Sequence, residues 1–237
     1  MNKYRNNRAL DSLRPIKIET GFQKFASASV LWSQGDTKVL TAINIENEVP
    51  PFLANSGRGW LTAEYSLLPA STQQRVQREA TKGKQTGRTV EIQRLIGRSL
   101  RQAIDLNRLG EKTIKIDCDV IQADGGTRTA AISSAWLCLS LALENMGLPK
   151  NILKQEIAAI SVGIVGGEVS LDLEYAEDSK ADVDMNVVMT AKGNFIEIQG
   201  TGENSDFSPN ELTELLTMAK KGINDIFAIN KKFLEVK

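Results

Sequence analysis

Polar and apolar residues alternate along the first third of the chain, which is the pattern of half-buried β-strands. The alternation runs through residues 16–18, 30–32 and 39–45, and it returns at 60–66. Gly35-Asp36 separates the second and third of these runs and suits a tight hairpin turn. The sequence therefore predicts four strands here, two of them joined by a hairpin.

Helical spacing of apolar residues follows further along the chain. It runs over residues 92–104, and Gly110 fits the position just past the end of that helix. Residues 130–143 are almost wholly small or apolar, which indicates a helix buried on most sides. A last helix is predicted after Ser208, because a proline at the first helical position and the capping-box residue Glu211 follow it.

The remaining runs predict further strands. Residues 114–120 alternate as a half-buried strand does, and two glycine-containing turns each lie between apolar runs. The predicted hairpins pair 160–164 with 169–175, and 186–189 with 195–199. Together these elements predict an α/β chain of the mixed-sheet, α+β kind, with more strands than helices.

Composition narrows the class of protein. The chain has 237 residues, which suits one large domain or two small fused ones, and 41% of them are apolar, enough for a core. We expect no signal peptide, and no apolar run is long enough to span a membrane. Cys118 and Cys138 both lie in apolar patterns, so we expect buried thiols and a reducing cytoplasm.

The chain contains no histidine, which excludes Ser-His-Asp and Cys-His catalysis and histidine-bound zinc. Net charge is zero but unevenly distributed: eight basic residues against two acidic ones lie between 75 and 101, and seven carboxylates against one lysine lie between 168 and 184. The stretch 69–88 is polar, basic and long for a loop. The basic segment at 75–101 suits binding of an anionic polymer, and the acidic segment at 168–184 suits binding of a hard cation. The alternative is that both segments are solvated surface.

A glycine-rich turn between a strand and a helix is the first candidate site. In the run Asp124–Thr129, two glycines let the backbone approach a ligand, and the helix start that follows attracts anions. Thr127 adds a hydroxyl and Arg128 a forked donor. The run is not a Walker A loop, since it lacks Gly-Lys-Ser/Thr. A plain glycine-rich turn is the alternative.

Arginines near the helix at 92–104 are the second candidate. Arg88 follows Gly87 and lies just before that helix, where a cation can meet an anion; an ordinary salt bridge is the alternative. The polar side of the helix carries Arg94, Arg98 and Arg101. These three stack on one stripe. Pairing with Glu91 and Asp105 is the alternative for the stripe.

The third candidate is the group of carboxylates at 177–178 and 182–184, which can hold Mg²⁺ or Mn²⁺ and leave positions for phosphate oxygens. A solvated acidic loop is the alternative. Two arginines at anion-ready positions, clustered carboxylates and the absence of histidine indicate metal-assisted phosphoryl transfer. The residues alone leave a nuclease, a kinase and a polymerase open.

Several longer motifs resemble the ribonuclease PH family. They occur in the family's order and spacing from about residue 13 to about residue 222. They are Gly59-Trp60-Leu61-Thr62-Ala63-Glu64-Tyr65, Gly87-Arg88-Thr89, residues 91–98, 117–120, 122–129 and 160–165, and Asp184-Met185-Asn186-Val187-Val188-Met189.

This resemblance implies a single domain of the ribonuclease PH type over residues 1–237, with the fold of the second domain of ribosomal protein S5. It implies a homohexamer built as a trimer of dimers. The implied activity is that of a phosphate-dependent exoribonuclease, or tRNA nucleotidyltransferase. It removes nucleotides beyond the CCA end of tRNA precursors, and from rRNA 3′ ends, as nucleoside 5′-diphosphates, and in reverse it adds nucleotides from diphosphates.

The resemblance also implies roles for individual residues. The phosphate site falls on Arg88, Gly126, Thr127 and Arg128, in agreement with the candidate anion sites. The catalytic carboxylates that hold Mg²⁺ or Mn²⁺ fall on Asp178 and Asp184. The RNA-binding positions fall on Arg75 and Arg78.

The chain departs from the family's pattern in several places, and two of these departures bear on RNA binding. Ala70 stands where the family usually has an arginine or a similar polar group, and Asn6-Asn7 replaces the usual pair between Arg5 and Arg8. Neither departure touches the phosphate or metal positions, so we expect activity to survive. Two rival hypotheses are a non-catalytic ring subunit that binds RNA and an unrelated metal-dependent phosphotransferase.

Overall fold

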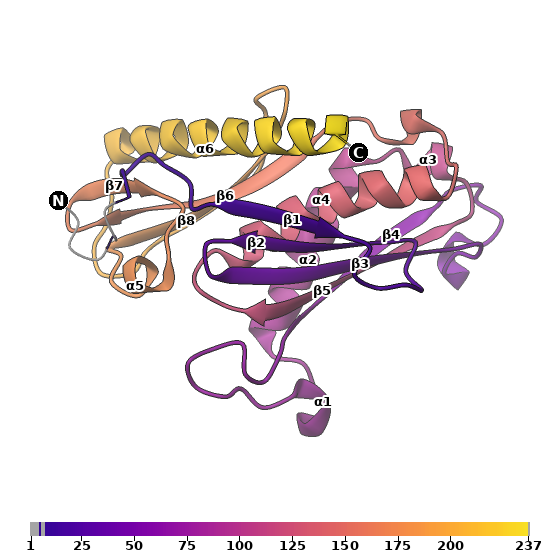
Figure 1. The fold of residues 1–237 in the computed structure, drawn as a ribbon, viewed down its shortest axis with the longest axis horizontal. Coiled ribbons are helices and arrows are strands. Elements are labelled where there is room, and N and C mark those ends of the chain that lie inside the picture. The colour runs from indigo at the N-terminus through magenta and orange to yellow at the C-terminus, as the bar shows by residue number, and fades with distance from the viewer. Residues whose placement is uncertain (1–4, 6–7, 237) are drawn as a thin grey trace.

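A computed structural model describes residue 5 and residues 8–236, and it contains two β-sheets (Figure 1). The first sheet has five strands in the order β1-β2-β3-β5-β4. All of its neighbouring pairs are antiparallel except β4 with β5. Its strands are β1 (Ile16–Thr20), β2 (Ala28–Gln34), β3 (Thr37–Glu46), β4 (Trp60–Leu67) and β5 (Thr113–Gln122).

The second sheet has four antiparallel strands in the order β7-β6-β8-β9. Its strands are β6 (Ile157–Val165), β7 (Glu168–Leu171), β8 (Val183–Thr190) and β9 (Phe195–Gly202). The α-helices are α1 (Glu79–Lys82), α2 (Gly87–Ala103), α3 (Leu106–Leu109), α4 (Thr127–Asn145), α5 (Tyr175–Asp178) and α6 (Pro209–Val236), with 3₁₀ turns at Pro51–Leu53 and Lys150–Ile152. The mixed α/β prediction is therefore confirmed.

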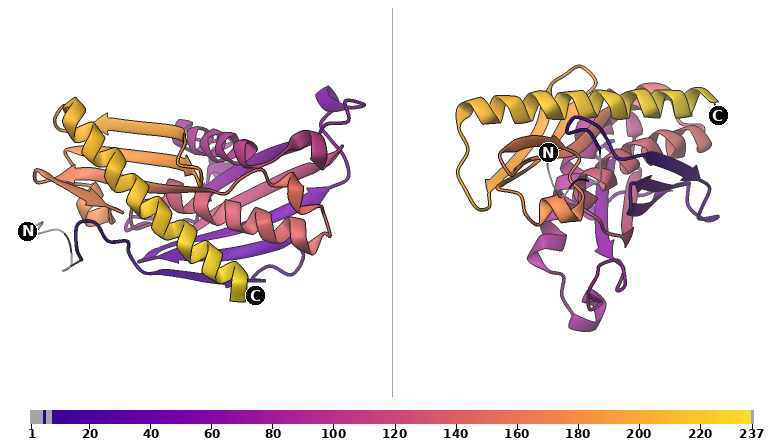
Figure 2. Two further views of the ribbon diagram at one scale, coloured as in Figure 1. Left: turned by 90° about the horizontal axis from the view of Figure 1, so that it is seen from above. Right: turned by 60° about the vertical axis from the view of Figure 1, so that its left-hand side comes forward.

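Helix α4 lies between the two sheets. It packs against β2 and β3 on one side and against β6 on the other, while the long helix α6 covers β6 and β7 (Figure 2). One continuous cluster of buried apolar residues joins both sheets through α4. A helix enclosed in this way has no polar face, as the run of small and apolar residues at 130–143 predicted.

The end of α2 differs from the prediction. The helix stops at Ala103, because Ile104 leaves the helical conformation and forms a β-bridge with Leu153. Asp105 then caps the separate short helix α3 by accepting hydrogen bonds from two backbone amides. Gly110 ends α3 rather than the helix at 92–104, so that assignment of Gly110 was wrong.

The strand predicted at 169–175 is also shorter than expected. Strand β7 ends at Leu171, because Asp172 takes a left-handed backbone conformation with φ 57°, and Tyr175 begins α5. Within the predicted loop 69–88, α1 forms a single turn and the last two residues already belong to α2. Arg88 therefore lies inside the first turn of α2, not before it.

The predicted β2–β3 turn and the predicted N-terminal cap of the last helix are confirmed. Gly35 turns the β2–β3 hairpin, in which Gln34 pairs with Thr37. At α6, the amide of Ser208 donates to the Glu211 carboxylate over 2.7 Å, and the amide of Glu211 donates to the Ser208 hydroxyl over 3.2 Å.

The arginines on the polar stripe of α2 do not pair with Glu91 or Asp105, which was the alternative considered for that stripe. Arg98 forms an ion pair with Glu197 of β9, at 2.8 Å, and Arg101 donates to the carbonyl of Leu61 while lying over the Trp60 ring. Glu91 and Asp105 pair with other arginines. Two members of the stripe thus connect α2 to β9 and β4.

Two expectations from composition can be compared with the structure. Cys118 and Cys138 are free thiols and both are buried, as predicted. Among the residues that the structure describes, no helix has the length and apolar character needed to cross a bilayer. The interpretation of residues 1–237 as a single domain stays a prediction, although the apolar core is continuous.

Candidate active site

The glycine-rich turn joins β5 to α4 and brings the start of that helix to the surface of a cavity. Gly125 and Gly126 have φ values of 75° and 65°, in the left-handed region that favours glycine. A Cβ on Gly125 would lie 2.3 Å from the carbonyl oxygen of Leu173, so the turn packs directly against the backbone of another segment. We call residues 124–126 the phosphate loop, after the ligand that the sequence predicts for it.

The N-terminus of α4 is open to an anion. Among the described residues, no side chain caps it by hydrogen bonding, and its first turn contains no acidic residue. The helix has 19 residues, so its first amides and its dipole present a partial positive charge at Thr127 and Arg128. This end of the helix can therefore bind a phosphate group.

The cavity has a volume of about 860 Å³ and is lined by all six residues predicted for phosphate and metal. These are Arg88, Gly126, Thr127, Arg128, Asp178 and Asp184. They come from α2, the phosphate loop, α4, α5 and β8, so the fold brings together segments that are far apart in the sequence.

The two arginines differ in their partners. Arg128 is mostly buried, donates to the side-chain oxygen of Gln199 over 3.1 Å and lies 3.7 Å from the Glu91 carboxylate. Arg88 is exposed and forms no ion pair with any residue that the structure describes. The salt-bridge alternative is therefore not realised for Arg88, whose charge faces the cavity without a carboxylate partner.

The two aspartates lie close enough to influence each other. Burial, and then the charge of Asp178, raise the pKa of Asp184 to about 6. Burial also raises the pKa of Asp178, although the positive charges of Arg88 and Arg128 oppose that shift. Glu177 next to Asp178 is fully buried and ion-paired with Arg8 at 3.0 Å, so the solvated-loop alternative does not describe this segment.

This carboxylate pair fits a divalent ion shared with a substrate. Magnesium is commonly held by one or two carboxylates and completes its shell with water and substrate phosphates. Within the part of the chain that the structure describes, no group of three or more histidine, cysteine or acidic residues forms a closed metal site. Asp178 and Asp184 are partly buried, and the charge of Asp178 raises the pKa of Asp184, so the pair nevertheless leaves negative charge for a cation to offset.

Several cavity residues were not assigned roles from the sequence. Tyr65 is buried, and its hydroxyl lies 2.9 Å from the Thr127 hydroxyl, which fixes that side chain at the start of α4. Glu203 also lines the cavity, and its charge contributes to the raised pKa of Asp184. Tyr65 belongs to a motif that resembles the family, which could have signalled it, whereas Glu203 carried no such signal.

Arg75 and Arg78 are not among the residues that line this cavity, although Gln74 and Val76 on either side of Arg75 are. Both arginines are exposed on the segment between β4 and α2, which extends away from the body of the molecule (Figures 1 and 2). Arg78 lines a second cavity of about 900 Å³ beside Asp117 and Asp119. Ala70 is exposed on the same segment, whereas Asn6 and Asn7 lie outside the described residues. The structure thus places Arg75 and Arg78 on a segment beside the cavity, but not in the cavity's lining.

The chain matches known proteins over nearly its whole length. Residues 12–149 match the model of the 3′ exoribonuclease family, domain 1, and residues 155–222 match domain 2 of that family. A ribonuclease PH of Syntrophomonas wolfei is 56% identical over 234 residues, covering 97% of this chain and 98% of the relative. A ribonuclease PH of Moorella thermoacetica is 53% identical over 233 residues, covering 97% of this chain and 93% of the relative.

Solved structures share the fold at lower identity. Rice Rrp46 superposes with a TM-score of 0.79 at 21% identity, covering 96% of this chain and 98% of that one. A chain of the Archaeoglobus fulgidus exosome with RNA bound to its active site gives a TM-score of 0.78 at 20% identity, covering 95% of this chain and 91% of that one. These likenesses support the fold alone.

The raised pKa of Asp184 generates a prediction about stability without divalent cations. A raised carboxylate pKa means that folding is favoured at low pH and loses this contribution as pH rises through about 6. Asp184→Asn should therefore be more stable than the wild type at pH 8, by on the order of 1–3 kcal/mol. Denaturant unfolding with a chelator present would measure the difference, which should vanish near pH 4.

Asp182→Asn is the matched control, because it removes a neighbouring carboxylate outside the cavity lining. Adding Mg²⁺ should stabilise the wild type more than Asp184→Asn. Equal stability of the wild type and Asp184→Asn across this pH range would contradict the assigned environment.

Proposed function

The chain belongs to the ribonuclease PH group of the 3′ exoribonuclease family, and on that premise we propose which of its residues perform phosphorolysis. Inorganic phosphate is the co-substrate of this reaction. One of its oxygens attacks the phosphorus that links the last nucleotide to the RNA, and the bond to the preceding 3′ oxygen breaks. The last nucleotide leaves as a nucleoside 5′-diphosphate, and the shortened RNA keeps the 3′ hydroxyl.

One observation carries this assignment: an anion site and a pair of carboxylates face the same cavity. Arg88, Arg128 and the N-terminus of α4 bind inorganic phosphate and reduce its repulsion by the anionic RNA. Gly126 lets the backbone approach the phosphate, and the Thr127 hydroxyl, held by Tyr65, supplies a further polar contact.

Asp178 and Asp184, which line the same cavity, would hold a Mg²⁺ or Mn²⁺ ion. When bound, the ion would offset the negative charge that accumulates at the scissile phosphate and on the leaving oxygen. The carboxylates of Asp178 and Asp184 attract a cation and repel inorganic phosphate, which is bound by the arginines instead. No histidine is required for any of these roles.

We infer that the RNA is a structured transcript with a single-stranded 3′ end, such as a tRNA precursor or rRNA. Arg75 and Arg78 contact its backbone from the segment before α2. Two buried free thiols, Cys118 and Cys138, suit a reducing cytoplasm, where these transcripts are processed. Family membership excludes the unrelated phosphotransferase, whereas the non-catalytic ring subunit is tested by the product assay.

The products of the reaction test the activity and the site together. With RNA that carries extra 3′ nucleotides and Mg²⁺, nucleoside diphosphates should appear only when inorganic phosphate is present. Arg88→Ala and Asp184→Ala should each lower kcat/KM at least about 100-fold, since each removes charge stabilisation of the reacting groups.

The matched control is Arg108→Ala, which removes an exposed arginine that pairs with Asp105 away from the cavity. Chromatographic identification of the nucleotide distinguishes the outcomes. Monophosphates formed without phosphate would mean hydrolysis, and RNA binding without any product would favour the non-catalytic subunit.

The loop arginines should affect RNA binding rather than phosphate binding. Arg75→Ala with Arg78→Ala should raise KM for RNA and reduce the slope of log affinity against log salt by about 0.7 for each lost phosphate contact to single-stranded RNA. Ala70→Arg should have the opposite effect, since it adds a cation to the same segment. An unchanged salt dependence in the double variant would contradict the role of this segment.

Assembly is the last part of this proposal: a homohexamer made of three dimers. Its support is the position of Arg75 and Arg78 outside their own chain's cavity, together with the open edge of β9, where Phe195 and Ile198 are 46% and 44% exposed. RNA bound at one active site would then meet the loop arginines of a neighbouring subunit.

Sedimentation velocity combined with activity measurements tests the assembly. Activity per chain should fall when dilution separates the ring into dimers, and KM for RNA should rise more than KM for phosphate. Dimers that retain full activity would show that the ring is not needed.

A further inference from the structure

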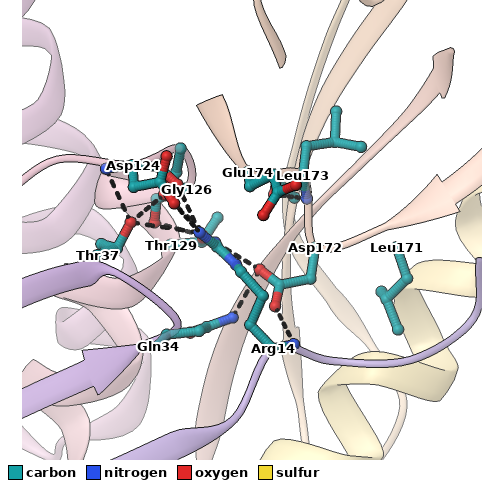
Figure 3. Close-up of polar contacts among 12 residues, drawn as sticks. Arg14, Gln34, Thr37, Asp124, Gly126, Thr129, Leu171, Asp172, Leu173 and Glu174 are labelled. Atoms are coloured by element: carbon teal, nitrogen blue, oxygen red, sulfur yellow. Dashed lines mark hydrogen bonds and ion pairs between the residues drawn. The ribbon is translucent and has the colours of Figure 1, made fainter. Parts of the chain in front are cut away.

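A buried ion pair outside the predicted site contacts the phosphate loop from behind. Arg14 precedes β1 and Asp172 follows β7, and their side chains are 4% and 1% exposed. One oxygen of the Asp172 carboxylate accepts a hydrogen bond from the Arg14 guanidinium at 2.7 Å, and the other accepts one from the Arg14 backbone amide, also at 2.7 Å. The Gln34 side-chain amide donates a third, at 2.8 Å (Figure 3).

The other face of the Arg14 guanidinium binds the phosphate loop. It donates to the carbonyl oxygens of Asp124 and Gly125, and it lies 3.8 Å from the Asp124 carboxylate. Thr37 supports the same loop: its hydroxyl accepts from the Asp124 amide at 3.1 Å and donates to the Gly125 carbonyl at 2.6 Å. Figure 3 shows Arg14 reaching from Asp172 to this loop.

These contacts determine the direction of the loop amides. In a trans peptide the carbonyl of one residue and the N–H of the next point in opposite directions. Since the carbonyls of Asp124 and Gly125 point to Arg14 and Thr37, the N–H groups of Gly125 and Gly126 point away from them. Both glycines line the cavity of the candidate active site.

The same pair connects the phosphate loop to the segment that carries Asp178. Gly125 packs against the backbone of residues 173–174, which follow Asp172 directly. The Tyr175 amide at the start of α5 donates to the Asp124 carboxylate at 3.3 Å. A change in the Arg14–Asp172 contact would therefore move the phosphate loop relative to α5.

We propose that Arg14 and Asp172 are positioning residues for inorganic phosphate, because their ion pair holds the phosphate loop in the orientation that exposes its amides to the cavity. This inference rests on the proposed function. Although burial raises the pKa of Asp172, the charge and hydrogen bonds of Arg14 outweigh burial and lower it. Asp172 is therefore ionised at neutral pH and holds the guanidinium in place.

Two variants test the loop contact in different ways. Arg14→Lys keeps the positive charge but loses the fork that spans Asp172 and two loop carbonyls. Thr37→Val keeps the shape of the side chain and removes the hydroxyl that binds the loop, without unpairing a buried charge. Each should raise KM for phosphate about 10-fold and leave KM for RNA unchanged.

Ser133→Ala is the matched control within α4. It removes a buried hydroxyl that accepts from the Ala159 amide and donates to the Ala159 carbonyl, on the side of the helix that meets β6. This variant should lower Tm and leave KM for phosphate unchanged. It therefore separates a general loss of stability from a loss of loop position.

A second measurement does not depend on activity. Inorganic phosphate should raise the Tm of the wild type and of Ser133→Ala, and should raise the Tm of Arg14→Lys and Thr37→Val much less. If Arg14→Lys does not fold, Thr37→Val decides the question alone. Phosphate binding and KM equal to wild type in every one of these two variants that folds would overturn the inference, as would equal increases in the two KM values.

The proposed function and the positioning role of Arg14 and Asp172 can be refuted independently of each other. If the wild type releases no nucleoside diphosphate, the proposed function fails, whereas the Tm measurement still reports whether Arg14 and Thr37 organise a phosphate site. If the wild type is active and both loop variants bind phosphate normally, phosphorolysis stands and the positioning role is wrong.

Discussion

The enclosure of α4 between two sheets is the constraint on which the rest of the structure depends. The helix contacts the first sheet through β2 and β3 and the second through β6, and its small residues Ala130, Ala131 and Ala135 are almost fully buried. A close-packed helix of this kind cannot shift without opening cavities or creating overlaps. Its N-terminus is therefore fixed where the two sheets meet, and the position of the anion site follows from the packing of the core.

Electrostatic balance at that position is incomplete in the protein alone. The pKa of Asp184 is raised because its charge is buried beside that of Asp178, and the two arginines only partly offset this effect. A cation between the aspartates would offset the remaining negative charge, and the arginines would then be available to an anion. The proposed site therefore needs the cation in order to accept the anion.

Local patterns predicted most of the elements and the chemistry of the site, but not how distant segments meet. Periodicity identified the strands and helices, and the glycines and arginines at helix starts indicated anion binding from the residues alone. The end of α2 was misjudged because the Ile104–Leu153 bridge joins residues far apart in sequence. The end of β7 was misjudged because Asp172 takes a left-handed conformation to meet Arg14, a contact that no local pattern encodes.

The phosphate loop is held by buried contacts, whereas the segment 69–88 is mostly exposed, and the proposed reaction explains this difference. Phosphate has the same shape in every cycle, so buried contacts can fix its loop once, during folding. The RNA end changes its sequence with every nucleotide removed, so its contacts must tolerate different bases. The segment 69–88, all of which the structure describes, has Ser71 as its only buried residue and presents exposed arginines, as the proposed RNA contact requires. Backbone contacts of this type give affinity without sequence preference, as repeated trimming requires.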